Sequence, residues 1–254
     1  MCRVSRRACH AVGFQIESQD QVSIFVIETL RRSAAHVFVQ SLETLALSTD
    51  DQHHLLKVLR VKSTDQITVS NGVGAWITAT LSKDGDVRAT SELFVVEPPK
   101  WSLSIAFAPV KGEKPELIVQ KLTELGIDEI IPLAPTARSV VRWDAAKAEK
   151  QTGRLQRVAD EASMQSRRVW LPVVHPVTQL ADLVSRAEVA FAEPGGVEVA
   201  AVHRTIVVGP EGGFAPDEFV GSVNRVSLGE SVLRAETAAI VAGALMTRCR
   251  RGEM

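Results

Sequence analysis

The apolar residues of this chain change their rhythm at Pro98 and Pro99, and this change constrains the fold more than any other feature. From Ala35 to about Glu97, short runs of alternating apolar and polar residues are separated by turn residues, which is typical of half-buried strands. From Trp101 onward, apolar runs of strand length alternate with segments of helical spacing, which indicates a mainly parallel sheet with helices between its strands. Two adjacent prolines interrupt a strand, so we place a domain boundary there.

The pattern divides the chain into three parts. Residues 34–99 are predicted to form a small β-barrel, and residues 100–254 are predicted to form an α/β domain. Residues 1–33 show no sustained period, and we expect either a disordered leader or a start site assigned too far upstream. The first residues are basic but lack the apolar core of a secretory signal, so we do not expect export.

Turn and cap residues locate several elements. Asn71–Gly72 predicts a tight turn between two strands, because both central positions of such a turn have φ > 0. Asp50 and Asp51 are the expected N-cap residues of a helix that includes residues 53–61.

Two helices are expected in the α/β part. The first is expected to begin near Pro115 and to end at Gly126, as proline favours the first turn of a helix and glycine its end. The second is expected to run from about Asp144 to Gln165.

Composition favours a globular cytoplasmic protein. Hydrophobic residues make up 45% and charged residues 23%, near the average for soluble domains, and no apolar stretch reaches the roughly 18 residues of a membrane span. Cys2, Cys9 and Cys249 lie at the two ends without metal-ligand spacing, so we expect a reducing, cytoplasmic setting and no metal. The net charge of −1 gives no general attraction to polyanions, so any RNA binding must come from local basic clusters.

The segment TIVVGPEGGF, residues 205–214, is the strongest candidate for a ligand loop. Glycines at the carboxyl end of a parallel strand allow main-chain N–H groups to approach a ligand closely. A tight turn before Pro216 explains the same residues equally well. The segment is neither a P-loop nor a dinucleotide fingerprint, because it lacks the lysine of the first and the glycine spacing of the second.

A second segment that leads from a strand into a helix is VSLGESVLRAETAAIVAGAL, residues 226–245. Arg234 stands immediately before the helix, where the dipole is already positive, so its guanidinium favours an anionic partner. Glu236 and Thr237 follow, and for these two the alternative to a role in a site is simple helix capping.

Cations between residues 111 and 168 provide a candidate surface for RNA phosphates. Acidic residues nearly balance them, so an ordinary solvated face is the alternative. No aromatic residue alternates with the cations in the sequence, so base stacking is not indicated. The cations are Lys111, Lys114, Lys121, Arg138, Arg142, Arg154, Arg157, Arg167 and Arg168.

Taken in order, five segments of the chain resemble one family, the uridine-N3 methyltransferases of 16S ribosomal RNA, which belong to the knotted SPOUT class. The segments are HHLLKVLRV (53–61), KGEKPELIVQKLTELGI (111–127), RSVVRW (138–143), VVGPEGGF (207–214) and LGESVLRAETA (228–238). The resemblance implies an N-terminal PUA-like β-barrel that binds RNA and a C-terminal α/β methyltransferase domain threaded into a trefoil knot. Met164 departs from the family pattern, which has Glu at this position.

The resemblance also implies a site for S-adenosylmethionine (SAM) and a surface for 16S ribosomal RNA within the small subunit, in a homodimer. The cofactor-binding residues that it implies are Glu193, Pro194, Gly195, Val208, Gly209, Pro210, Glu211, Gly212, Gly213, Leu228, Gly229, Leu233, Arg234, Thr237 and Ala238. The catalytic residues are Arg234, Glu211 and Glu236. The RNA-binding residues are Arg60, Lys62, Lys111, Lys114, Arg138, Arg142, Arg167 and Arg168.

Methylation at N3 of uridine requires that the ring nitrogen lose its proton and attack the sulfonium methyl group in line, so we expect catalysis by proximity and electrostatics without a metal. Arg234 is expected to stabilise the anionic uracil or to bind its phosphate, and Glu211 or Glu236 to accept the proton or orient the cofactor. Alternatives are a knotted methyltransferase for transfer RNA or another ribosomal base, and a non-catalytic ribosome-assembly protein. A nucleotide-dependent α/β enzyme ranks last, because the chain lacks a phosphate-binding motif.

Overall fold

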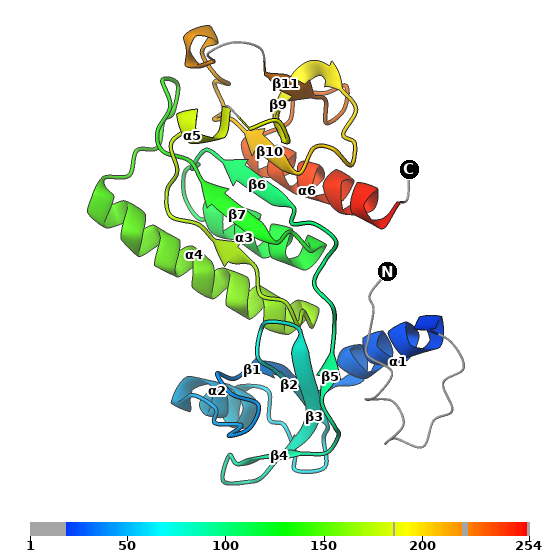
Figure 1. Ribbon diagram of the computed structural model, residues 1–254. Coiled ribbons are helices and arrows are strands. Elements are labelled where there is room, and N and C mark those ends of the chain that lie inside the picture. Colours follow the sequence, from blue (N-terminus) through cyan, green and yellow to red (C-terminus); the bar gives the residue numbers. More distant parts are fainter. Residues whose placement is uncertain (1–18, 185, 220–222, 253–254) are drawn as a thin grey trace. The chain divides into compact units, whose positions relative to one another are not determined.

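The computed structural model describes residues 19–184, 186–219 and 223–252 (Figure 1). The chain forms two compact units. Unit 1 comprises the residues up to Lys100 together with Ser163–Leu171, and unit 2 comprises Trp101–Ala162 and the residues from Pro172. The first change of unit therefore falls beside the predicted boundary, whereas the return of Ser163–Leu171 to unit 1 was not predicted.

Unit 1 is built on a five-stranded sheet. Strands β1 to β4 lie side by side in chain order, and β5 pairs with the opposite end of β3. β1 runs parallel to β2, and the other pairs are antiparallel. The strands are β1 (His36–Phe38), β2 (Ile67–Ser70), β3 (Ala75–Leu81), β4 (Val87–Ala89) and β5 (Phe94–Val95).

The predicted hairpin between β2 and β3 is confirmed, but its loop is longer than a two-residue turn. Ser70 pairs with Trp76, and Gly72 and Gly74 have φ of +74° and +93°. Asn71 does not adopt a positive φ; instead its Oδ1 accepts hydrogen bonds from the N–H groups of Val73 and Ala75 at 3.0 and 3.1 Å. The asparagine therefore closes the loop through its side chain.

The N-cap prediction for the helix of residues 53–61 was wrong, because the observed N-cap stands two residues before Asp50 and three before Asp51. Helix α2 (Thr49–His53) is capped by Ser48, whose hydroxyl accepts a hydrogen bond from the Asp51 N–H at 3.0 Å. Asp50 and Asp51 lie in the first turn, where carboxylates interact favourably with the helix dipole. The helix continues as a π-helical turn, η2 (His54–Val58), which buries Leu55 in the core of unit 1.

The prediction of a disordered leader was wrong for residues 19–32, which form helix α1 (Gln19–Arg32). Val26 and Leu30 are 2% and 7% exposed and pack in one cluster with Trp76, Phe94 and Val169. The spacing of Val26 and Leu30 by one helical turn explains why the segment covers this cluster. Residues 1–18 lie outside the described residues.

Ser163–Leu171 completes unit 1 from a distant part of the chain. The Trp170 Nε1–H donates to the Val96 carbonyl at 3.0 Å, and the Gly74 N–H donates to the Val169 carbonyl at 2.8 Å. A Cβ atom at Gly74 would lie 2.6 Å from the Trp170 ring, so the hairpin loop requires glycine there. Trp170 thus packs on the loop and beside the stacked pair of Trp76 and Phe94.

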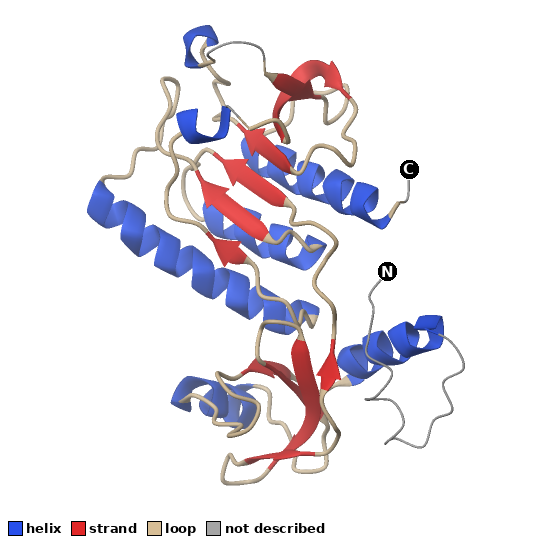
Figure 2. Cartoon of the chain, viewed as in Figure 1, coloured by secondary structure: helices blue, strands red, loops and turns tan. Residues whose placement is uncertain are grey.

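A six-stranded parallel sheet forms the centre of unit 2 (Figure 2). Its order across the sheet is β11-β9-β10-β6-β7-β8. Each neighbouring pair is parallel, as the alternation of strands and helices predicted. The strands are β6 (Ser104–Phe107), β7 (Glu129–Pro132), β8 (Val173–Val174), β9 (Val189–Val197), β10 (Thr205–Val208) and β11 (Asn224–Val226).

The two faces of this sheet have separate hydrophobic clusters. Residues such as Ile105 and Ile206 face α3 (Lys114–Leu125), α4 (Ala145–Ser166) and α6 (Ala235–Arg251). Ala106 and Val207, their neighbours along the strands, face α5 (Ala181–Val184) and the segment that contains Phe214. No helix within the described part of the chain is long and apolar enough to cross a membrane.

The predicted ends of the first two long helices of unit 2 are confirmed. Pro115 is the second residue of α3, and Gly126 ends the helix with φ +94°. The carboxylate of Asp144 accepts a hydrogen bond from the Lys147 N–H at 2.8 Å and so caps α4. The trefoil knot stays a prediction, because strand order and register alone do not trace how the chain is threaded.

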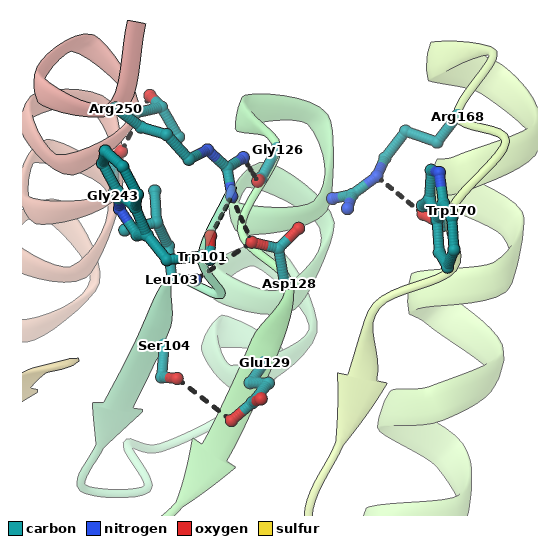
Figure 3. A network of polar contacts seen from close by, with 11 residues as sticks. Trp101, Leu103, Ser104, Gly126, Asp128, Glu129, Arg168, Trp170, Gly243 and Arg250 are labelled. Atoms are coloured by element: carbon teal, nitrogen blue, oxygen red, sulfur yellow. Dashed lines mark hydrogen bonds and ion pairs between the residues drawn. The ribbon is translucent and has the colours of Figure 1, made fainter. Parts of the chain in front are cut away.

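Arg250 fastens the end of α6 to the amino edge of the sheet (Figure 3). Its guanidinium forms an ion pair with Asp128 and donates to the carbonyls of Gly126 at 2.7 Å and Trp101 at 3.3 Å. The same Asp128 carboxylate accepts a hydrogen bond from the Leu103 N–H at 3.0 Å. This network joins α6, the end of α3 and the first residues of β6, at the edge opposite the candidate site.

Candidate cofactor and RNA site

Three neighbouring strands of unit 2 bring the predicted cofactor segments to one edge of the sheet. β9 lies between β10 and β11. β10 ends directly before residues 209–213, β11 ends two residues before Leu228, and Glu193 lies in β9 itself. Because parallel strands end at the same edge, segments that are distant in the sequence meet there, at the position where open α/β sheets bind ligands.

A groove of about 100 Å³ lies between the β9 segment and the loop that leads into α6. Gly229 has φ +138°, and no atom lies within 4 Å of the position that its Cβ would take, so its main chain is open to a ligand. The predicted residues that line the groove are Glu193, Pro194, Leu228, Gly229, Leu233 and Ala238. The lining residues that were not predicted are Ala192, Ser231 and Val232.

Arg225 holds the acidic residue of the groove. Its Nε lies 2.6 Å from the Glu193 carboxylate, and its guanidinium lies 5.7 Å from the centroid of the Phe219 ring. Sequence reasoning missed Arg225, because it stands 32 residues from Glu193 and no local pattern marks it. The pairing of β11 with β9 is what brings these residues together.

The GPEGG segment, residues 209–213, is shaped by packing as well as by exposure. A Cβ atom at Gly209 would lie 2.9 Å from the Phe214 ring, which supports the tight-turn alternative for this glycine. Gly213 has φ +67° and open surroundings, and Glu211 is exposed. Pro210 is buried. None of the described residues that line the groove comes from this segment.

Two side chains link the loop that follows β7 to the GPEGG segment and to the residues directly after it. Arg138 donates from Nη1 to the Gly212 carbonyl at 3.0 Å. The two carboxylate oxygens of Glu218 accept hydrogen bonds at 2.6 Å from the N–H groups of Ala137 and Ala215. Glu218 was not predicted, although a glutamate three residues after a helix entry is a known capping signal.

Gly195 has φ +79° and, like Gly213, has no neighbour where a Cβ would stand.

Glu236 and Lys114 form an ion pair at 2.9 Å between the first turns of α6 and α3. The hydrogen bond from Lys114 is the main cause that lowers the pKa of Glu236, and its own N–H and the charge of Arg234 act in the same direction. The carboxylate is therefore ionised at neutral pH and is a weaker base than an ordinary glutamate. Lys114, which was predicted to bind RNA, has its charge balanced within the chain.

Arg234 is the N-cap residue of α6, with φ −66° and ψ 152°, and its side chain makes no capping hydrogen bond. It is exposed, and its guanidinium has no hydrogen bond or ion pair among the described residues. Thr237 is also exposed, whereas Val208 is 3% exposed and contributes its side chain to the sheet core. Arg234 thus remains an uncommitted cation next to the groove residue Leu233.

The predicted RNA-binding residues fall into different environments. Arg60 and Lys62 are exposed in unit 1, and Lys111 and Arg142 are exposed in unit 2. Arg60 has φ +54°, a left-handed conformation that turns the chain after η2. These four residues have free access to a polyanion.

Arg167 and Arg168 serve the structure of unit 1 instead of presenting free charges. Arg167 donates to the carbonyls of Met164 at 2.7 Å and Ser33 at 3.1 Å, and burial lowers its pKa. Arg168 donates from Nε to the Trp170 carbonyl at 3.1 Å. Met164, the departure from the family pattern, packs against the core of unit 1.

Two family models match the chain. The model of an RNA methyltransferase domain matches residues 97–247, and the model of an RNA methyltransferase PUA domain matches residues 47–93. The first match covers unit 2 as far as residue 247, and the second covers residues 47–93 of unit 1.

Characterised relatives and solved structures agree with these matches. The chain is 30% identical to the ribosomal RNA small subunit methyltransferase E of Mycobacterium bovis, over 86% of this chain and 88% of that protein. It is 31% identical to the protein of the same name from Rickettsia conorii, over 78% and 87%. A candidate methyltransferase of Legionella pneumophila, solved with bound SAM, shares 26% identity at a TM-score of 0.67, over 85% of this chain and 97% of that one.

Proposed function

Since this chain belongs to the family of small-subunit ribosomal RNA methyltransferases E, we propose that it transfers the methyl group of SAM to N3 of a uridine in 16S ribosomal RNA. The observation that carries the proposal is the meeting of the β9, β10 and β11 ends at one sheet edge, with a groove between two of them. The proposal includes the assembled small subunit as substrate, a homodimer as the active form and a cytoplasmic location.

The groove fits part of a nucleoside-based cofactor. Pro194, Leu228 and Leu233 offer apolar surface, and Glu193 and the open main chain of Gly229 offer polar contacts. Its volume of about 100 Å³ is below the roughly 300 Å³ at which ligand pockets usually begin, so the ligand must extend beyond the groove. SAM supplies a methyl group on a positively charged sulfur. In this proposal, Arg225 orients the Glu193 carboxylate so that it accepts hydrogen bonds from the cofactor.

We assign different roles to the three proposed catalytic residues. Arg234 has an unpaired guanidinium beside the groove, so it is placed to stabilise an anionic uracil ring or to hold its phosphate. Glu236 is ionised and engaged with Lys114, so it acts as a positioning residue for the start of α3. The exposed Glu211 is then the better proton acceptor of the two glutamates.

Methyl transfer to small subunits from cells that lack this gene tests the proposal. We expect one N3-methyluridine, detected by nuclease digestion and mass spectrometry, in 16S ribosomal RNA. Methylation of another ribosomal base or of transfer RNA would contradict the proposed substrate. The chain would then be a knotted methyltransferase with a different target. A protein that binds small subunits but not SAM would instead be an assembly factor.

A Gly229→Val variant tests the groove itself. Gly229 lines the groove and its surroundings are open, so a valine there should lower the affinity for SAM, measured by calorimetry, at least tenfold. Because the positive φ strains any side chain, the melting temperature should also fall, by about as much as in the control variant. Gly252→Val is the matched control, because Gly252 also has a positive φ of +77° and open surroundings but lies at the far end of α6. Equal SAM affinity in both variants would remove the groove from the cofactor site.

A further inference from the structure

Unit 2 contains a second, larger cavity that none of the cofactor segments lines. It has a volume of about 400 Å³ and lies beyond the end of β6, between the entry to α3 and the first turns of α4. Its walls include Lys111, Glu116, Trp143, Lys147 and Arg154. These residues come from segments separated by up to about 40 positions, so the sequence alone did not bring the tryptophan together with the cations.

The cavity combines three kinds of contact. Trp143 packs partly against the core of unit 2, which fixes its ring at the wall. Lys111 and Lys147 supply positive charge, whereas the charge of Arg154 is balanced by Glu116. An aromatic face beside cations is the arrangement by which proteins hold the base and the phosphate of single-stranded nucleic acid.

Glu116 adds a hydrogen-bond acceptor. Its Oε1 pairs with Arg154 at 3.0 Å, and its side chain is 15% exposed. Its Oε2 is buried and has no hydrogen-bond partner among the residues that the structure describes. A buried carboxylate oxygen without a donor is costly, and the amino or imino group of a base would satisfy it.

The cavity and the groove lie at the same edge of the sheet. The cavity follows the carboxyl end of β6, and the groove lies beside residues 192–194 within β9 and after the end of β11. The ion pair of Lys114 and Glu236 lies between the cavity and the groove. Lys114 stands between Glu113 and Pro115, which line the cavity, and Glu236 stands two residues before Ala238, which lines the groove.

We propose that this cavity binds one nucleotide of the RNA strand, next to the uridine that is methylated, with its base against Trp143 and its phosphate near Lys111 and Lys147. The identity of the neighbouring uridine rests on the proposed function. Binding of a nucleotide in the cavity does not, because it follows from the ring, the cations and the acceptor.

Two lysines on α4 provide a matched pair of variants. Lys147 lines the cavity, whereas Lys150 is exposed on the same helix and does not line it. With a fluorescein-labelled single-stranded RNA decamer as probe, Lys147→Gln should reduce the slope of log K against log salt by about 0.7, the value for one lost contact with a single strand. Lys150→Gln should leave the slope unchanged.

The tryptophan is tested in the same assay. Trp143→Leu should weaken decamer binding roughly 5-fold to 100-fold, the range for one base stacked on an aromatic ring, and Trp143→Phe should retain most of the affinity. SAM affinity should equal that of the unmodified protein in each variant, which also reports on folding. If Trp143→Leu fails to fold, the surface variant Lys147→Gln decides the matter.

The outcomes separate this inference from the proposed function. In the first outcome, the unmodified protein methylates one uridine, and the Lys147→Gln variant and the folded Trp143 variants bind the decamer as tightly as the unmodified protein does. The inference is then wrong and the proposed function stands. If these variants lose decamer binding but the unmodified protein methylates no ribosomal RNA, the inference stands and the function fails. Loss of binding to small subunits with unchanged decamer binding also overturns the inference, since it points to a ribosomal protein as the ligand.

Discussion

His36 makes the stability of unit 1 depend on pH. It is 2% exposed, its Nε2 lies 2.9 Å from the Arg168 carbonyl, and its Nδ1 lies 2.8 Å from the Thr68 hydroxyl. Since a carbonyl only accepts, Nε2 carries a proton and donates to it, and in the neutral ring Nδ1 can accept from the Thr68 hydroxyl. Burial, with a smaller contribution from the charge of Arg167, lowers the pKa of His36 from 6.5 to about 4.

The sign and size of the effect follow from linkage. Between pH 6.5 and 4 the unfolded chain binds a proton that the folded chain does not, so the free energy of unfolding falls as the pH falls through this window. From pH 7.5 to pH 5 the loss should be about 2 kcal/mol, at about 1.4 kcal/mol for each pH unit below the pKa of the unfolded state. Below the folded-state pKa both states are protonated and the loss is complete.

Urea unfolding followed by tryptophan fluorescence measures this loss, with Trp76 and Trp170 reporting on unit 1. His36→Gln is the comparison, because glutamine can donate to the Arg168 carbonyl but does not titrate. The variant is expected to be less stable at pH 7.5 and to lose about 2 kcal/mol less than the unmodified protein between pH 7.5 and 5. An identical pH dependence in both proteins would refute the assignment of this titration to His36.

Three further predictions concern other contacts. Leu30→Ala should lower the free energy of unfolding of unit 1 by about 2 to 4 kcal/mol in urea titrations, because Leu30 is a buried residue of α1 that packs in the cluster of Trp76 and Phe94; no loss would mean that α1 does not pack there. Arg250→Met should cost about 3 kcal/mol by removing the cation that balances the largely buried Asp128 carboxylate, and Asp128→Asn added to it should restore part of this loss; additive losses would contradict the pairing. Arg234→Ala should reduce the single-turnover rate at saturating RNA far more than RNA affinity, and a loss of affinity alone would place Arg234 among the phosphate contacts.

The sequence predicted the parts of the fold that depend on local patterns. The alternation after Trp101 predicts the parallel sheet, and Pro115 and Gly126 mark the ends of α3, because these signals act within a few residues. Helix α1 escaped prediction because residues 1–33 show no sustained apolar period, although Val26 and Leu30 of its described side chains are buried. The return of Ser163–Leu171 to unit 1 depends on the packing of Trp170 against a hairpin loop almost a hundred residues earlier in the chain. A contact between residues so far apart leaves no local pattern in the sequence.

The candidate site was predictable where one segment supplies its own geometry. The loop before α6 and the β9 segment, both predicted to bind the cofactor, line one groove, and cofactor binding there stays a prediction. Arg225 and Glu218 were not found, because each acts on a partner that sheet pairing or loop packing brings near. Charge counting also overestimated the free cations, since Lys114, Arg167 and Arg168 have acceptors within the chain that only the folded structure reveals.

The split of unit 1 along the chain sets an order for its synthesis on the ribosome. When Lys100 has been made, the stacked pair of Trp76 and Phe94 still lacks Val169, and the Gly74 N–H still lacks its carbonyl. The missing segment follows roughly 70 residues later, or about 4 to 14 s at typical rates of translation. By then the residues of β6, β7, α3 and most of α4 have been made, so unit 1 cannot finish folding until the first part of unit 2 has been synthesised.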